Sequence, residues 1–231
     1  MGIKERHDRD REAVRRGILD AARELFVSEG FRNVSIRKIA ERIEYSPAAI
    51  YGYFPSKDDI FFALAEEGFR LLGDPGTAPA ATELNALAPL DRLRAIFRRL
   101  YQFSREHPQY FALMFVERSV PRISREYERF AFAREMKRHL VEHIQSCIDA
   151  GVLPATVKPL VAIRLVTMSI VGLATLSLSD RLAPTEDADR LAHDVINVVL
   201  AGLETGIELE SSGDIDCPLG DEDEAGDLQA S

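Results

Sequence analysis

The side chains best suited to bind another molecule gather in one short stretch, residues 46–54, with the sequence SPAAIYGYF. A serine–proline pair comes first, two alanines follow, and Tyr51 and Tyr53 then supply long side chains that end in hydroxyls. Small residues let a helix approach the base edges in the major groove of DNA, and flanking hydroxyls can donate to phosphates. The alternative is a pair of core helices with an aromatic stripe. The order of residue types favours recognition of double-stranded DNA.

Two short helices joined by a tight turn would present this stretch. Apolar residues recur at helical spacing in the first of them, at Ile36, Ile39, Ala40 and Ile43. Ser35 stands just before it as an N-cap, and Ser46 followed by Pro47 gives the same signal for the second helix. The second helix is expected over residues 48–54, because a proline follows. Two helices this short and this close match the helix-turn-helix pattern.

The stretch around these helices, residues 12–72, resembles the DNA-binding domain of the TetR/AcrR family of one-component bacterial transcriptional regulators. The residue pairs that carry the resemblance are Gly30-Phe31, Ser35-Ile36, Ile39-Ala40, Ile50-Tyr51, Tyr53-Phe54 and Ser56-Lys57. This combination is more specific than a generic helix-turn-helix pattern. The resemblance implies direct DNA contacts from Ser35, Arg37, Lys38, Ser46, Pro47, Ala48, Tyr51, Tyr53 and Lys57.

Glu44 departs from the family's pattern, which usually has glycine in the turn before the recognition helix. If the turn still needs a left-handed residue, Glu44 costs roughly 1 kcal/mol there; otherwise the turn is built differently. Its negative charge also lies near the expected groove, so we expect Glu44 to tune the choice of operator.

The composition is that of an ordinary globular protein, with 231 residues, 46% hydrophobic and 29% charged. The first residues are too polar for a signal peptide. The longest apolar stretch, residues 160–178, contains Arg164 and several Ser and Thr, which favours a buried helix over a membrane span. Cys147 and Cys217 lie far apart and give no disulfide framework. We therefore expect a cytoplasmic protein.

The net charge of −9 is unevenly distributed along the chain. Residues 1–57 hold 12 Lys and Arg against 9 Asp and Glu, whereas residues 204–231 hold 10 Asp and Glu and no Lys or Arg. The acidity therefore belongs largely to the C-terminal tail, and the overall charge does not argue against a DNA-binding face.

Breaks in helical periodicity indicate an all-α chain of about nine helices. Helices beyond the first domain are expected over residues 90–106, 108–118, 122–150, 157–179 and 186–208. An N-terminal three-helix helix-turn-helix domain precedes a C-terminal helical bundle. The expected parts are a flexible arm (1–11), the DNA-binding domain (12–72, with the motif at 35–54), a linker (73–89), an effector-binding and dimerisation domain (90–209) and a disordered acidic tail (210–231).

Aromatic residues and methionine are frequent between residues 97 and 132, where each could simply be core. As a set they exceed what a small bundle needs, and a partly hollow bundle can hold an apolar ligand. The family resemblance implies such a pocket in the second domain. We expect no cofactor. The candidate members of the pocket are Phe97, Tyr101, Tyr110, Phe111, Met114, Phe115, Arg118, Phe130, Arg134, His139 and His143.

Glu135, His139 and His143 recur at i, i+4 and i+8, a spacing that could offer a carboxylate and two imidazoles to a metal. A polar helix face explains the same spacing, and no second ligand cluster appears in the sequence. A metalloenzyme built on these residues is therefore only a remote alternative. With no nucleophile–base set and no glycine-rich phosphate loop, we expect neither catalytic residues nor a metal site.

The last two expected helices, 157–179 and 186–208, are apolar over so much of their surface that they must be buried, within the chain or against a partner. A homodimer that pairs them into a four-helix bundle fits the pattern and the family resemblance. The sequence thus predicts a homodimeric repressor that a small, mostly apolar effector releases from a palindromic operator. An activator or partner-regulated protein of the same fold remains the alternative.

Overall fold

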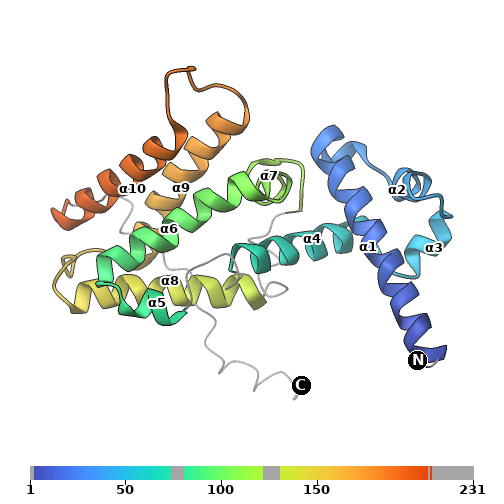
Figure 1. Cartoon of the computed structure of the whole chain (residues 1–231), viewed down its shortest axis with the longest axis horizontal. Helices are drawn as coiled ribbons and strands as arrows, with labels where there is room; N and C mark the ends of the chain where they lie inside the picture. The colour runs from blue at the N-terminus through green and yellow to red at the C-terminus, as the bar shows by residue number, and fades with distance from the viewer. Residues whose placement is uncertain (1–2, 74–80, 122–130, 208, 210–231) are drawn as a thin grey trace, which may run out of the picture.

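The computed structural model describes residues 3–73, 81–121, 131–207 and 209, and within these ranges its regular secondary structure is all helical, with no strand (Figure 1). The all-α prediction is therefore confirmed. Four α-helices build the N-terminal domain: α1 (Ile3–Glu29), α2 (Ile36–Arg42), α3 (Pro47–Tyr51) and α4 (Lys57–Leu72). Six follow in the bundle: α5 (Ala81–Ala86), α6 (Pro89–Glu106), α7 (Pro108–Phe111), α8 (Ala131–Asp149), α9 (Pro159–Leu178) and α10 (Ala188–Glu204). A 3-10 turn (Phe31–Asn33) and a π-helical turn (Ala112–Val116) complete the described elements.

The N-terminal domain packs α1, α2 and the first turns of α4 around aromatic side chains. Phe31 lies edge-on to Phe26 and to Phe61, with ring centroids 4.9 Å and 5.8 Å away. Ile18, Ile39 and the two outer phenylalanines are fully buried. This core fixes the angle at which the two helices of the motif leave the domain.

Helix α1 begins at Ile3, whereas the sequence placed a flexible arm over residues 1–11. Residues 5–13 are exposed, so no apolar stripe signals this part of the helix. Local contacts support it instead, such as the bond from Nε of Arg9 to the carbonyl of Glu5 at 3.4 Å. Residues 1 and 2 lie outside the described ranges.

One short helix appears where no helix was predicted, so the described ranges hold ten α-helices rather than about nine. Helix α5 lies inside the expected linker 73–89, and the guanidinium of Arg92 donates to the carbonyls of Leu84, Asn85 and Leu87 near its end. The helix expected over 108–118 divides into α7 and the π-helical turn. Residues 74–80, 122–130 and the acidic tail 210–231 lie outside the described ranges.

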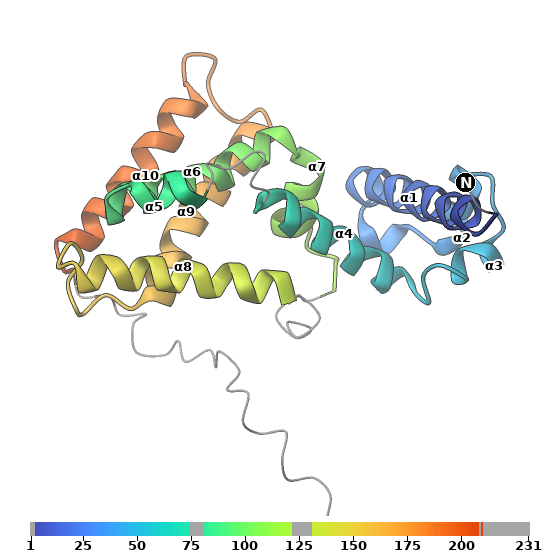
Figure 2. The same cartoon turned by 60° about the horizontal axis from the view of Figure 1, so that its bottom comes forward.

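Helix α9 is the central apolar helix of the bundle, packed against α6, α8 and α10 (Figure 2). Within the described ranges it is the one helix long and apolar enough to cross a membrane, with a mean hydropathy of 1.9 in its most apolar window. Only 33% of that window is buried inside the chain. The remaining apolar surface of α9 is therefore uncovered in a single subunit.

Helix α4 connects the two domains. Its first half contributes to the N-terminal core, and its second half contacts α6, α7, α8 and the π-helical turn. Helix α1 also contacts α7 and the same π-helical turn. The bundle thus reaches the N-terminal domain through α7 and the residues that follow it.

Candidate nucleic-acid interface

Two serine caps begin the helices of the predicted motif. The Ser35 hydroxyl accepts a hydrogen bond from the Lys38 amide at 3.2 Å, and the Ser46 hydroxyl accepts one from the Ala49 amide at 3.2 Å. Pro47 occupies the first position of α3, where no amide hydrogen is missed. Both caps that the sequence predicted are therefore present. Helix α3 ends earlier than expected, at Tyr51 rather than Phe54.

Glu44 forms the turn between the two helices in a left-handed conformation, with φ of 59°. The amide of Glu44 donates to the carbonyl of Glu41 at 3.3 Å, and the amide of Tyr45 donates to the carbonyl of Ala40 at 2.9 Å. These two bonds are those of a Schellman motif, which favours glycine at the left-handed position. The turn therefore keeps the conformation for which glycine is suited, although glutamate occupies it.

One side of α3 faces solvent and the other faces the core. Ser46, Pro47 and Ala48 are exposed, and Tyr51 is 56% exposed. Ile50 is fully buried and Phe54, just beyond the helix, is 4% exposed. Figure 1 shows α3 at the end of the molecule away from the bundle. The small residues and Tyr51 are thus free to meet another surface.

The three basic residues predicted to contact DNA differ in their exposure and in their partners within the protein. Arg37 is exposed and pairs with Glu41 at 2.8 Å. Lys38 pairs with Glu29 of α1. Lys57 is partly buried, and its ammonium donates to two backbone carbonyls of the protein itself.

Two arginines of α1 that were not among the predicted DNA contacts lie beside this face. The guanidinium of Arg11 lies 5.6 Å from the centre of the Tyr53 ring, and that of Arg15 lies 5.2 Å from the centre of the Phe54 ring. Arg11 had been assigned to a flexible arm, and only the helical continuation of α1 brings it beside Tyr53. The spacing of four residues between Arg11 and Arg15 was the feature of the sequence that could have indicated this placement.

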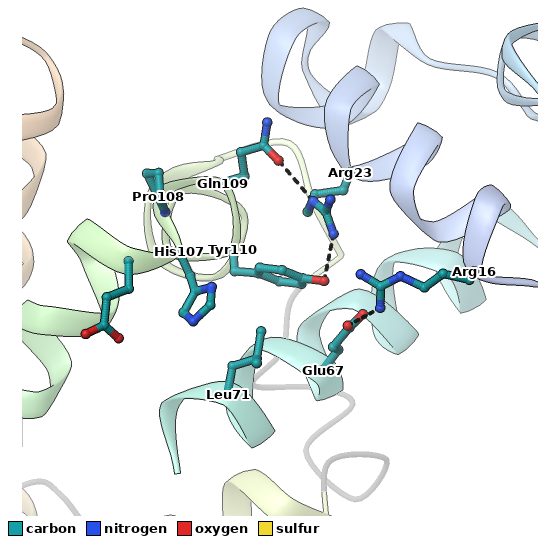
Figure 3. Close-up of a pocket in the computed structure, with 9 residues that line it drawn as sticks. Arg16, Arg23, Glu67, Leu71, His107, Pro108, Gln109 and Tyr110 are labelled. Atoms are coloured by element: carbon teal, nitrogen blue, oxygen red, sulfur yellow. Dashed lines mark hydrogen bonds and ion pairs between the residues drawn. The ribbon is translucent and has the colours of Figure 1, made fainter. Parts of the chain in front are cut away.

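A polar network joins the N-terminal domain to the bundle. Arg23 of α1 donates to the Tyr110 hydroxyl of α7 at 2.8 Å and to Oε1 of Gln109 at 2.9 Å. Arg16 pairs with Glu67 of α4. These side chains border a cavity of about 460 Å³, together with residues at the end of α6 (Figure 3). Burial raises the pKa of Tyr110, so its hydroxyl keeps its proton.

The predicted ligand-pocket residues fall into two groups. Phe97, Tyr101, Tyr110, Phe111 and Met114 are buried in the bundle core, and Phe115 packs against that core, its ring 5.1 Å from that of Phe111. The polar candidates lie farther out: Arg118, Arg134 and His139 are exposed, and His143 is partly buried. Phe130 lies outside the described residues. Phe111 and Phe115 are thus in ring contact and the other described apolar candidates belong to the same core, whereas the polar candidates lie nearer the surface.

Both ring nitrogens of His139 face carboxylates, those of Glu135 at 3.0 Å and Glu142 at 3.2 Å. Within the described ranges, no group of three or more His, Cys, Asp or Glu residues is arranged to hold a metal ion. The spacing of Glu135, His139 and His143 is thus that of a polar helix face, and the metalloenzyme alternative gains no support.

Two family models match the chain. The model described as bacterial regulatory proteins, tetR family, matches residues 18–64. The model described as tetracyclin repressor-like, C-terminal domain, matches residues 93–199. Between them they take in the helix-turn-helix and most of the bundle.

Curated relatives match chiefly through the N-terminal domain. The HTH-type transcriptional repressor Rv1474c of Mycobacterium tuberculosis is 44% identical over 55 residues, which are 24% of this chain and 29% of that protein. The HTH-type transcriptional regulator RutR of Escherichia coli is 30% identical over 105 residues, 46% of this chain and 48% of RutR. The chain thus spans less than half the length of these curated relatives.

Solved structures match over both domains. The transcriptional regulator FadR from Bacillus subtilis, solved with stearoyl-CoA, gives a TM-score of 0.65 at 17% identity, over 80% of this chain and 97% of that chain. AibR, solved with isovaleryl coenzyme A and operator DNA, gives a TM-score of 0.60 at 19% identity, over 80% of this chain and 96% of that chain. At these identities the likeness shows a shared fold.

Proposed function

Because the chain belongs to the TetR family of bacterial regulatory proteins, we propose that it is a homodimeric transcriptional repressor that a small-molecule effector releases from its operator. The observation that carries this proposal is the outward face of α3, capped by Ser46 and anchored by buried Ile50 and Phe54. The protein acts where bacterial DNA is found, in the cytoplasm. Its output is occupancy of DNA, with no catalytic step.

Each subunit inserts α3 into a major groove. Ala48 lets the helix approach the base edges, while Tyr51 and Tyr53 donate hydroxyls to the backbone or the bases. Ser35, Ser46 and Pro47 lie at the starts of the two helices, and Arg37 and Lys38 supply charge from α2. Two copies read a palindromic operator whose half-sites are about 34–36 Å apart, one turn of duplex.

A second copy of the chain covers the uncovered apolar surface of α9 and α10. Met168 of α9 is 59% exposed and Val198 of α10 is 70% exposed, although both belong to apolar helices. Exposed apolar side chains on adjacent helices mark an interaction surface. Pairing of α9 and α10 with the same helices of a second copy, about a two-fold axis, buries the exposed apolar side chains of both helices. It also sets the distance between the two copies of α3.

The π-helical turn carries the effector signal to the N-terminal domain. Its Phe115 packs with Phe111 among the apolar candidates for the pocket. On its other side Met114 packs directly on Gly68 of α4, where a Cβ would overlap the Met114 Sδ. An effector that displaces Phe115 therefore moves Met114 against α4, and α4 carries the helix-turn-helix. DNA and effector then oppose one another reciprocally.

The effector is a small molecule with a mostly apolar body. The buried candidates for the pocket are aromatic or aliphatic, which suits an acyl or aromatic group. The FadR and AibR structures contain stearoyl-CoA and isovaleryl coenzyme A. Acyl-CoA thioesters of different chain lengths are therefore the first effectors to test against the protein–DNA complex.

Selection of bound duplexes from a random pool tests the proposal. We expect enrichment of one palindromic motif with half-site centres about 10–10.5 base pairs apart or a multiple of that distance. Recovery of no shared motif from repeated rounds, with folded dimeric protein, would contradict the proposed function. Enrichment of a single asymmetric site would instead contradict the two-fold arrangement.

A further inference from the structure

Lys57 begins α4 four residues after Tyr53, where the sequence predicted a contact to a DNA phosphate. Its ammonium donates to the carbonyl of Phe31 at 2.7 Å and to that of Val34 at 2.9 Å. The same nitrogen lies 4.2 Å from the centre of the Phe31 ring. An ammonium has three donors, and two carbonyls and one ring face account for them.

These partners flank the turn that leads into the helix-turn-helix. Phe31 and Val34 stand at the two ends of the 3-10 turn between α1 and α2, and both are buried. Ser35, the N-cap of α2, is the next residue. The Lys57 side chain thus ties the first turn of α4 to the start of the motif. The Phe31 ring is in turn held edge-on by Phe26 and Phe61.

We propose that Lys57 is a positioning residue, which fixes the helix-turn-helix against α4 by holding the Phe31–Val34 turn, and that it makes no direct phosphate contact. The inference rests on the proposed function, because it concerns how the same DNA-binding face is held. A phosphate at Lys57 would have to displace one of the two carbonyls or the contact with the Phe31 ring. Burial also lowers the pKa of Lys57, as expected for an ammonium partly removed from water.

Salt dependence of DNA binding separates a positioning lysine from a phosphate contact, because each lost contact lowers the slope of log K against log salt by about one. The DNA is the duplex recovered by selection. For Lys57→Met we expect the affinity for DNA to fall about tenfold, which is the loss expected for charged hydrogen bonds. The slope of log K against log salt should stay that of the parent protein. Arg37→Gln, which removes an exposed charge, is the comparison and should lower the slope.

Lys57→Arg gives the second arm. A phosphate contact would survive it, since arginine binds phosphate at least as well as lysine. The planar guanidinium cannot fit between two carbonyls and a ring face in the geometry of an ammonium, so the positioning role predicts that Lys57→Arg loses affinity as Lys57→Met does. Circular dichroism and thermal unfolding establish that each variant is folded at the temperature of the binding measurement.

Two results would overturn the inference: a slope lowered by about one in Lys57→Met with full affinity in Lys57→Arg, or unchanged affinity and slope in both variants. Amide hydrogen exchange of residues 31–36 tests the tie without DNA. We expect Lys57→Met to accelerate exchange there at least tenfold, and unchanged exchange would also overturn it. If the parent protein prefers no duplex, the proposed function fails, whereas the exchange experiment still decides the role of Lys57.

Discussion

Arg23 and Tyr110 belong to different domains and share a hydrogen bond of 2.8 Å, from Nη1 of the guanidinium to the phenol oxygen. The same guanidinium lies 4.9 Å from the centre of the Tyr110 ring and pairs with Asp20 of its own helix at 2.9 Å. Arg23 thus binds α7 through hydrogen bonds and the face of the Tyr110 ring, while Asp20 holds the guanidinium from its own helix. This contact holds the N-terminal domain in one orientation relative to the bundle.

Removal of the Tyr110 hydroxyl tests this contact. For Tyr110→Phe we expect a loss of about 1 kcal/mol in the free energy of unfolding, because the ring stays packed while one hydrogen bond is lost. A double-mutant cycle with Arg23→Met, in which urea unfolding measures the free energy of each variant, isolates the interaction between the two side chains. A coupling free energy near zero would show that the bond does not hold the domains together.

Gly68 tests the close approach of α4 to the π-helical turn. A Cβ there would overlap the Sδ of Met114 and lie 3.3 Å from Cδ1 of Tyr110, so Gly68→Ala should destabilise the protein by about 1–3 kcal/mol. Gly17 of α1 is the matched control, since a Cβ there meets nothing within 4 Å. Gly17→Ala should stabilise by about 0.5–1 kcal/mol. Equal effects of the two substitutions on thermal unfolding would contradict the close packing at Gly68.

At Glu44 we expect a substitution to raise the stability of the protein. Because φ is 59° in the turn before α3, Glu44→Gly should stabilise the protein by about 1 kcal/mol. Gly151 has φ of 70° and open space around it, so Gly151→Ala should destabilise by about the same amount through backbone strain alone. Urea unfolding of both variants measures the difference. A Glu44→Gly variant less stable than the parent would mean that the glutamate side chain stabilises the turn.

His143 gives stability a pH dependence. Burial, and next the charge of Arg92, lower its pKa in the folded protein. The unfolded chain, with an ordinary histidine pKa of about 6.5, therefore binds the proton more readily. Stability from this group is complete above pH about 6.5 and falls as the pH drops toward the lower folded pKa. We expect His143→Gln to lose less stability than the parent between pH about 7 and about 5; an identical loss in urea unfolding would exclude His143 as the source.

Val198 tests the proposed dimer surface. Its side chain is 70% exposed, so Val198→Glu should leave the fold of one subunit intact while burying a charge in the pair. Sedimentation of the variant should show a monomer at concentrations where the parent is a dimer. Val27→Glu on α1, at a site 39% exposed, is the control and should stay dimeric. A dimeric Val198→Glu variant would place the interface elsewhere.

The sequence was sufficient for features that one helix or one turn determines. The caps at Ser35 and Ser46, the inward side chains of Ile50 and Phe54, and the all-α class follow from local spacing. These features depend on neighbours within a few residues, which periodicity and capping rules describe directly.

Contacts between distant segments were not predictable in the same way. The family resemblance implied a DNA contact for Lys57, and nothing in the sequence indicated that its ammonium donates to carbonyls 23 and 26 residues earlier in the chain. The bond from Arg23 to Tyr110 spans 87 residues. Charge at a surface position says nothing about a backbone carbonyl brought to it by folding, so such partners require the structure.

Competition between the selected duplex and mixed-sequence DNA, at salt of about 0.15 M, tests the presentation of α3 most directly. The account predicts a preference of at least about 1,000-fold for the selected duplex in the parent protein. It also predicts a changed motif when selection is repeated with Ala48→Leu, because that side chain enters the groove. Equal affinity for the selected and mixed duplexes, in a protein shown to be folded and dimeric, would contradict it.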